Sequence, residues 1–203
     1  MPRNVIDASK LFTPDGLPEE PHAQTFEMEG RIHLTRVSRI DIPGGEGTHV
    51  LAPFFLDLNG ATLFDLGLKT FFGEGIVVRF RFGEPGSIIG PAEMEMGASS
   101  SIRRGDIAIL SNLGTPENAP TFTPEAAAWL VERGAKMVGF DEHFRIDADG
   151  YFGTHATFLS AGVPVIRNLV NLGQASGGRV AVMAFPLAMK GLASSPVRVV
   201  ILD

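Results

Sequence analysis

The sequence predicts one α/β domain in which mixed sheets of short strands are flanked by a few helices. Its 203 residues are enough to bury one substantial core, and 44% of them are hydrophobic against 20% charged, as in ordinary globular domains. Strand patterns fill the first half of the chain, whereas strand and helix patterns alternate in the second half. No segment is rich enough in glycine and proline to be a linker, so residues 1–203 are expected to form a single domain. An α+β arrangement stays open on these patterns alone.

Apolar patterns with a period of two, and short β-branched runs, mark the expected strands. Residues 31–42 and 76–82 alternate between apolar and polar, which predicts half-buried strands with Arg79 and Arg81 facing solvent. Residues 91–97 alternate Met with Glu, which favours an edge strand or a segment that faces a partner. Further runs suit buried strands at residues 106–110, 137–140, 163–166, 180–183 and 197–201.

Two helices are expected in the second half of the chain. Residues 124–133 form the clearer one, with Thr123 as N-cap, a proline at the first helical position and Gly134 placed to end it. Residues 155–161 suit a second, shorter helix that ends near Gly162.

Composition excludes several classes of partner. The formal net charge of −6 argues against a nucleic-acid or anionic-membrane surface, since either requires a basic patch. There are no cysteines, which excludes disulfides, thiolate ligands and a cysteine nucleophile. No apolar run approaches the roughly 18 residues that span a membrane, and the first residues lack the apolar core of a signal peptide. We therefore expect a cytoplasmic protein that acts on a small molecule.

One segment carries most of the functional information. Residues 44–55 read Gly-Gly-Glu-Gly-Thr-His-Val-Leu-Ala-Pro-Phe-Phe. This resembles His-x-Gly-Thr-His-x-Asp-x-Pro-x-His, the signature of the cyclase family of metal-dependent hydrolases, to which bacterial kynurenine formamidases belong. Gly45, Leu51 and Phe55 stand where the family has His, Asp and His. Four positions of the signature are kept: Gly47, Thr48, His49 and Pro53.

The resemblance extends over nearly the whole chain. It implies the swivelling β/β/α fold of the family, a homodimer or homotetramer, and a site in which one or two zinc or manganese ions activate water against an amide, ester or lactone. In the family's C-terminal half a His is followed twelve residues later by a Glu, and here His155 is followed by Arg167. Other matching segments, in the family's order, are residues 5–9, 102–110, 127–141, 163–169, 185–187 and 195–198.

Most of the implied metal ligands are missing. His49 and His155 are the only family ligands that remain, and a guanidinium at position 167 would repel a divalent ion at close range. We therefore predict that the family's metal centre is lost and that no cofactor is needed. Zinc or manganese stays open as an alternative, if ligands come from elsewhere. The candidates for such a relocated site are Glu46, His49, Asp57, His143 and His155.

The replacements suggest a different chemistry. Arg167 could supply the positive charge of the metal, since a guanidinium binds carboxylates and stabilises oxyanions. His49 and His155 could then transfer protons, and Glu46 could pair with Arg167 or act as a base.

The predicted pocket is more apolar than that of the family. Leu51, Phe54 and Phe55 would line it, and they suit an aromatic or polyketide-like carbonyl compound that undergoes hydrolysis or ring closure. Asp141, in a Gly-Phe-Asp that matches a family position, is a further pocket candidate, with a turn residue as the alternative.

Structural interpretations remain open beside these hypotheses. His49 could hydrogen-bond the backbone of its own turn, and His155 could be a buried structural histidine. Arg167 could form a salt bridge with Asp141 or Glu46. The protein could also be an inactive paralogue that binds a ligand or stabilises a partner subunit. The remaining histidines, His22, His33 and His143, are expected to face solvent.

Overall fold

Nine strands form the main sheet of this protein. The computed structural model describes residues 4–10, 22–28, 31–37, 45–81, 84–98, 102–146 and 152–203. Four parallel strands make the centre of the sheet, and antiparallel strands extend it on both sides. In sheet order the strands are β1 (Val5–Asp7), β14 (Val200–Leu202), β12 (Arg179–Met183), β5 (Phe72–Phe80), β7 (Ile107–Asn112), β9 (Met137–Asp141), β11 (Val165–Leu169), β4 (His49–Leu51) and β13 (Ser194–Pro196).

The central strands are buried on both faces, which corrects the prediction that β5 is half-buried. Ile76 and Val78 pack into one hydrophobic core, and Val77, between them, packs into a second core on the opposite face. Arg79 is half-buried rather than on a solvent face. Strands covered on both sides read as continuous apolar runs, which is the pattern of β7 and β9.

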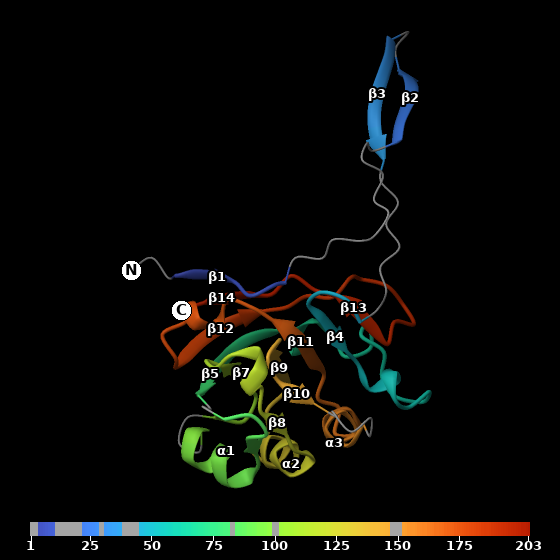
Figure 1. Cartoon of the computed structure of the whole chain (residues 1–203). Coiled ribbons are helices and arrows are strands. Elements are labelled where there is room, and N and C mark those ends of the chain that lie inside the picture. The colour runs from blue at the N-terminus through green and yellow to red at the C-terminus, as the bar shows by residue number, and fades with distance from the viewer. Residues whose placement is uncertain are drawn as a thin grey trace.

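Three helices cover one face of the main sheet (Figure 1). They are α1 (Pro91–Ala98), α2 (Pro124–Glu132) and α3 (Gly153–Ser160). The core beneath them contains four phenylalanine rings whose contacting centroids lie 5.0–6.4 Å apart. The expected N-cap of α2 is confirmed, because the Thr123 hydroxyl accepts a hydrogen bond from the Ala126 N–H at 3.3 Å. Gly134 follows α2 with a φ of +78°, as a helix-ending glycine should.

The α1 segment corrects a prediction from the sequence. The alternation of Met and Glu over residues 91–97 favoured a strand, but the segment is helical, and Met94 and Ala98, one turn apart, are its buried residues. Met96 is 90% exposed. Trp129 of α2 and Arg133, its C-cap residue, both donate to the Glu95 carboxylate, at 3.0 and 2.6 Å, so α1 is held against α2.

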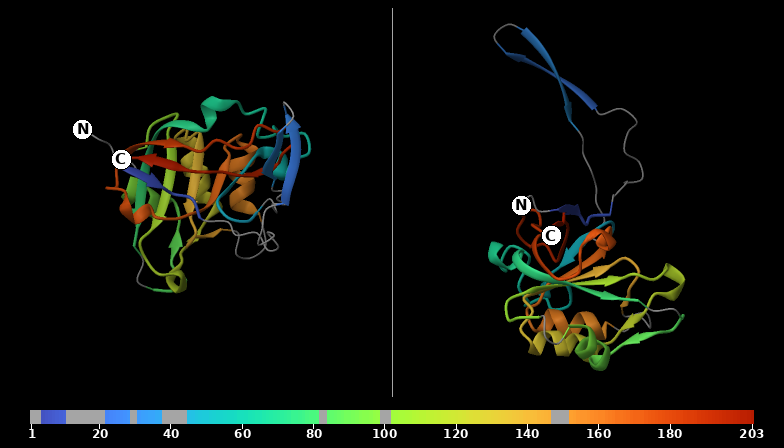
Figure 2. Two further views of the ribbon diagram at one scale, coloured as in Figure 1. Left: turned by 90° about the horizontal axis from the view of Figure 1, so that it is seen from above. Right: turned by 90° about the vertical axis from the view of Figure 1, so that its left-hand side faces the viewer.

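The sheet curls so that its margins cover the second core. Both views of Figure 2 and that of Figure 1 place β1 and β14 on the side of the sheet away from the helices. Ser9, just after β1, bridges to Leu169 of β11, which is far away in the sheet order. The curl therefore closes one side of the molecule over the ends of β4 and β11.

Two smaller sheets complete the fold. Parallel strands β6 (Ile88–Ile89), β8 (Thr121–Phe122) and β10 (Arg145–Ile146) form one of them. Antiparallel strands β2 (His22–Met28) and β3 (Arg31–Val37) form a ribbon that extends away from the main sheet (Figures 1 and 2). The expected strand at residues 31–42 is thus confirmed for its first part, and residues 38–42 lie outside the described residues. Four short 3-10 helices are η1 (Pro53–Phe55), η2 (Leu68–Thr70), η3 (Pro116–Asn118) and η4 (Leu172–Gln174).

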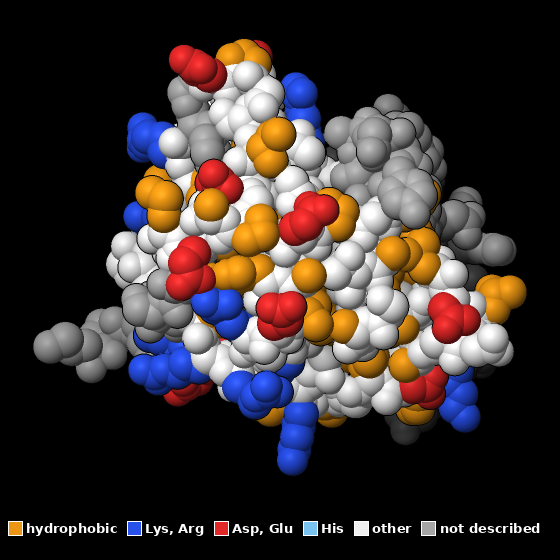
Figure 3. Space-filling view, turned by 90° about the horizontal axis from the view of Figure 1, so that it is seen from below, with side chains coloured by type: hydrophobic (Ala, Val, Ile, Leu, Met, Phe, Trp, Pro, Cys, Tyr) orange, Lys and Arg blue, Asp and Glu red, His pale blue; other side chains and the backbone are white. Residues whose placement is uncertain are grey.

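The predicted α/β class is confirmed, and most of the predicted elements are present. The runs at residues 106–110, 137–140, 163–166 and 180–183 fall in or overlap β7, β9, β11 and β12, whereas the run at 197–201 becomes a strand only from Val200. No helix in the described part of the chain is long and apolar enough to cross a membrane. On the helical side, acidic and basic side chains lie beside one another with apolar ones between (Figure 3), so this face offers no continuous basic surface.

Candidate functional site

The six positions singled out by the signature and by the later His and Glu line a single cavity. Its volume is about 590 Å³, and it opens beside β4, β11 and the start of α3. Two of the six positions keep a histidine, and the other four carry the replacements. The lining residues are Gly45, His49, Leu51, Phe55, Phe152, His155, Arg167, Asn168, Ala193 and Ser194.

Strand pairing brings the histidine of the signature beside Arg167. β4 and β11 are antiparallel, and His49 lies directly opposite Arg167 in their register. Side chains opposite each other in an antiparallel pair lie on the same face, with Cβ atoms roughly 4.5–5.5 Å apart. Leu51 follows His49 by two residues and therefore lines the same cavity. His155 reaches the cavity from α3, which packs against β11.

Arg167 and His155 are hydrogen-bonded to each other. Arg167 Nη1 lies 3.1 Å from His155 Nε2. A guanidinium can only donate, so the imidazole nitrogen must accept, and the ring carries its hydrogen on Nδ1. His155 is buried. Its side chain therefore holds the arginine head group at the cavity wall.

His49 is held by a hydrogen bond from one of its ring nitrogens. Its Nδ1 lies 3.1 Å from the Gly47 carbonyl oxygen, which can only accept. The neutral ring is thus protonated on Nδ1 and keeps a lone pair on Nε2. Burial lowers the pKa of His49 below 6.5, the hydrogen bond to the Gly47 carbonyl opposes this, and the positive charge of Arg167 lowers the pKa further, as would a proton on His155. His49 therefore has the properties of a base that stays unprotonated at neutral pH.

The open side of the cavity is aromatic. Phe55 and Phe152 meet edge to face, with ring centroids 6.3 Å apart, and Phe152 lies 6.1 Å from the His155 ring. Both phenylalanines are substantially exposed, at 40% and 51%, whereas Leu51 is buried. Phe152 was not predicted from the sequence, although its place directly before the second Gly-Thr-His triplet was a usable signal.

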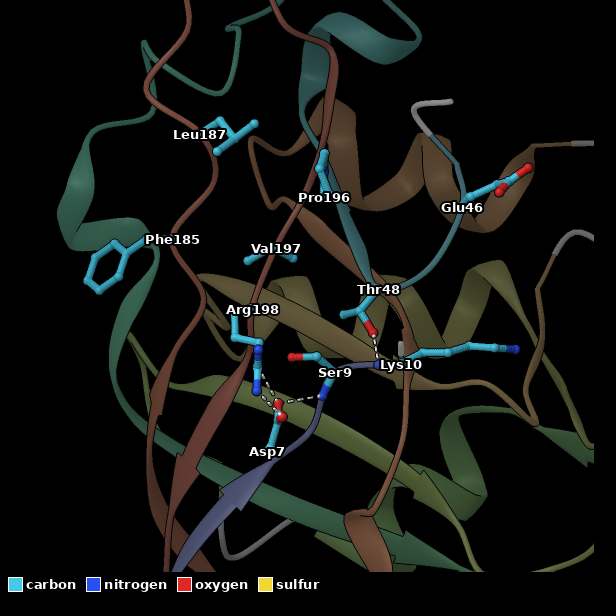
Figure 4. Close-up of a pocket in the computed structure, with 10 residues that line it drawn as sticks. All are labelled: Asp7, Ser9, Lys10, Glu46, Thr48, Phe185, Leu187, Pro196, Val197 and Arg198. Atoms are coloured by element: carbon cyan, nitrogen blue, oxygen red, sulfur yellow. Dashed lines mark hydrogen bonds and ion pairs between the residues drawn. The ribbon is translucent and has the colours of Figure 1, made fainter. Parts of the chain in front are cut away.

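Three other candidates lie outside this cavity. Glu46 is exposed and lines a second cavity of about 510 Å³, where its side chain points away from Thr48 and Lys10 (Figure 4). Phe54 is half-buried and is not among the lining residues. Asp141 ends β9 and accepts a hydrogen bond from the His143 main chain at 3.0 Å, the turn role left open by the sequence. Burial raises the pKa of Asp141, and that hydrogen bond opposes the rise.

Three of the five candidates for a relocated metal site, Glu46, Asp57 and His143, do not line the cavity of His49 and His155. Asp57 is exposed and caps its own turn by accepting from the Asn59 N–H at 2.9 Å. His143 lies beside Asp141 and Glu142 rather than at the cavity. His22 and His33 lie on β2 and β3, where the structure describes the backbone only.

The donors at the cavity do not fit a zinc or manganese centre. Such ions need several His, Asp or Glu ligands that converge on one point. Over the residues that the structure describes, no three side chains of these types form a group that could hold a metal. At the cavity itself the Nε2 atom of His155 is bonded to a guanidinium, and that permanent charge opposes a cation beside it.

Comparisons with known proteins agree with the fold and with the family resemblance. The sequence model of the Cyclase family, described as "Putative cyclase", matches residues 6–148. A kynurenine formamidase of Bacillus cereus (strain ATCC 14579) is 29% identical over 161 residues, 76% of this chain and 74% of the relative. Two solved structures share the fold. A potential metal-dependent hydrolase with cyclase activity has a TM-score of 0.74 at 24% identity and 98% coverage of both chains. An isatin hydrolase bound to the product analogue thioisatinate has a TM-score of 0.72 at 15% identity, covering 98% of this chain and 92% of that one. Because the family model spans well over half of the sequence, the protein belongs to the cyclase family of hydrolase-type enzymes.

Proposed function

We propose that this enzyme hydrolyses, or closes a ring on, a small carbonyl compound, with Arg167 supplying the positive charge that a metal ion would supply. The observation that carries the proposal is the contact of Arg167 with His155 in the cavity that His49 also lines. All three side chains are thus available to one bound molecule, and the apolar wall excludes water around them.

Arg167 is suited to the carbonyl oxygen of the substrate. A guanidinium that donates hydrogen bonds to this oxygen stabilises the negative charge that develops when the carbonyl is attacked. The contact of Nη1 with His155 Nε2 holds the head group at the cavity wall, where it can be oriented towards a bound carbonyl. Lysine at this position would keep the charge but lose the planar fork.

His49 is the better placed of the two proton-transfer candidates. Its Nε2 lone pair can take a proton from water or from an acidic carbon, because Nδ1 is held by the Gly47 carbonyl. His155 is the second candidate, and it could accept a proton at Nε2 once Arg167 turns towards the substrate. Glu46 lines the other cavity, so it is the weakest of the proposed catalytic groups.

The walls of the cavity favour a planar, apolar substrate. Phe55 and Phe152 present ring faces and edges to the opening, which suits an aromatic or polyketide-like molecule. Kynurenine formamidase and isatin hydrolase, by their names, suggest the first compounds to try, namely the formamide of kynurenine and isatin.

The test is turnover by the chelator-treated protein on a panel of aromatic amides, lactams and esters. We expect turnover that survives removal of metals and falls by roughly 100-fold or more in Arg167→Gln, the loss typical of one oxyanion donor. Arg198→Gln is the matched control, since Arg198 is 76% exposed and lines the other cavity. Turnover that appears only with added zinc or manganese would favour the metal-dependent alternative. No turnover at all would favour an inactive, ligand-binding paralogue.

A further inference from the structure

Asn168 has an unusual backbone conformation beside the site. Its φ is +60°, in the left-handed region, and within the described residues only Asn171 among the non-glycine residues shares this feature. The pairing of β11 with β9 shifts register between Ile166 and Leu169. Non-glycine residues held there are strained, and such strain gathers at functional sites.

This conformation changes what lines the cavity. In a regular strand Arg167 and Asn168 would point to opposite faces of the sheet, yet both line the cavity. The irregularity at position 168 therefore accompanies the presence of two consecutive residues, Arg167 and Asn168, at one cavity.

Both the side chain and the main chain of Asn168 are hydrogen-bonded to the signature segment. Its side-chain Nδ2 donates to the Gly47 carbonyl oxygen at 2.9 Å. Its main-chain oxygen accepts from the Thr48 hydroxyl at 2.7 Å, and this hydroxyl accepts in turn from the Lys10 N–H at 2.7 Å. Thr48 is buried, so these bonds are shielded from water.

The Gly47 carbonyl is the acceptor that Asn168 shares with His49. The same oxygen lies 2.9 Å from Asn168 Nδ2 and 3.1 Å from His49 Nδ1. Gly47 has a φ of +61°, a conformation that glycine adopts without strain. The amide of Asn168 is thus a second donor to this carbonyl, beside His49, and is placed to hold its direction.

We propose that Asn168 is a positioning residue, which holds the Gly47 carbonyl so that His49 donates from Nδ1 and keeps its Nε2 lone pair for the ligand. The catalytic part of this inference rests on the proposed function, whereas the effect of Asn168 on the His49 tautomer does not. Which ring nitrogen carries the hydrogen is a property of the free protein and can be measured without substrate.

The test is nitrogen NMR of the histidine side chains in the wild type and in Asn168→Gly. Glycine tolerates the left-handed backbone and removes the side chain that carries the amide, and the His49 signals are assigned by their loss in His49→Gln. We expect one tautomer, with the hydrogen on Nδ1, in the wild type, and a mixture of both tautomers with a shifted titration midpoint in Asn168→Gly. The kcat/KM of this variant should fall about tenfold or more, since a misplaced base loses part of its effect.

Asn171→Gly is the matched control. Asn171 has nearly the same φ, +61°, and its Nδ2 also donates to a backbone carbonyl, that of Asp7, at 2.9 Å. We expect this variant to keep the wild-type His49 signals. Asn168→Asp is a second test, because it keeps the size of the side chain but cannot donate to the Gly47 carbonyl, and it should reproduce the mixed tautomers.

Three results would overturn the inference. They are a wild-type His49 with its hydrogen on Nε2, a pure Nδ1 tautomer in both Asn168 variants, and an equal change in Asn171→Gly. Failure of the proposed function looks different. A wild type without turnover, whose His49 tautomer still depends on Asn168, would support the positioning role and reject the catalytic one.

Discussion

Arg167 is the residue that most changes the chemistry of the cavity. It stands where the resemblance places a Glu, so the position carries a permanent positive charge instead of a negative one. It lies opposite His49 in the strand register and bonds His155. Two neutral imidazoles and a guanidinium can bind an anion or a polarised carbonyl, and the charge of the guanidinium repels the cation that the family site would hold.

The pH dependence of turnover tests the role of His49. A base acts only when unprotonated, so kcat/KM should be constant near neutral pH and fall as the pH drops through the lowered pKa of His49, below 6.5. Arg167→Gln removes one of the charges that lower this pKa, and the acid limb should therefore move to higher pH. Where turnover of the variant is too slow, NMR titration of His49 gives the same midpoint. An acid limb above 6.5 in the wild type would argue against His49 as the base.

The aromatic wall is tested by three phenylalanines. Phe55→Ala and Phe152→Ala should raise the KM for aromatic substrates by roughly 2- to 10-fold, because an aromatic contact contributes about 0.5–1.5 kcal/mol beyond its buried area. Phe54→Ala is the control, since Phe54 adjoins Phe55 in sequence but does not line the cavity. Equal effects of all three substitutions would contradict the assignment of Phe55 and Phe152, without Phe54, to the cavity wall.

Pairing of elements decides which side chains meet at the site. β4 has three residues, yet it places His49 opposite Arg167 because β11 lies on one side of it and β13 on the other. The short length of β4 hides it from periodicity, and the sequence alone did not predict it as a strand. The apolar runs that begin β7 and β9 were predicted well, since strands buried on both faces are largely apolar.

The site was predictable in part. His49, His155 and Arg167 could be grouped through the family resemblance, but their distance along the chain gave no other reason to bring them together. Phe152 was missed although it directly precedes the second Gly-Thr-His triplet, and Asn168 was missed because its role depends on a register shift that leaves no pattern in the sequence. The α1 segment was expected to be an edge strand or a segment that faces a partner, because four alternating residues are too few to distinguish the period of a strand from that of a helix.

Two glycines test how closely β5 is packed, Gly75 against β7 and Gly97 against α1. A Cβ at Gly75 would lie 2.4 Å from the Ile107 carbonyl oxygen, so Gly75→Ala must displace backbone and should lower the free energy of unfolding by about 1–3 kcal/mol. Gly97 lies in α1, where a Cβ would meet the Phe80 ring at 3.4 Å. Because alanine reduces the freedom of the unfolded chain, Gly97→Ala should raise the free energy of unfolding by about 0.4–1 kcal/mol. Urea unfolding followed by circular dichroism measures both. A Gly75→Ala protein as stable as the wild type would contradict the close approach.

At the scale of the whole molecule, the β2–β3 ribbon points to assembly. The ribbon extends away from the main sheet (Figure 1), and a two-stranded ribbon is only marginally stable by itself in water. We therefore propose that a second copy of the chain covers it, in the homodimer or homotetramer that the family resemblance implies.

Light scattering during gel filtration tests this assembly. The wild type should have the mass of a dimer or tetramer, and a variant with residues 22–37 replaced by a short Gly-Ser linker should shift towards the monomer. A monomeric wild type at micromolar concentration would contradict the proposal.

The most direct test of the central claim, that Arg167 replaces the charge of a metal, is calorimetric titration of the chelator-treated protein with zinc and manganese. The positive control restores the signature residues and the Glu by Gly45→His, Leu51→Asp, Phe55→His and Arg167→Glu, since all four positions line the cavity with His49 and His155. We predict submicromolar, stoichiometric binding in this variant and none in the wild type. Submicromolar, stoichiometric binding of either ion by the wild-type protein would contradict the claim.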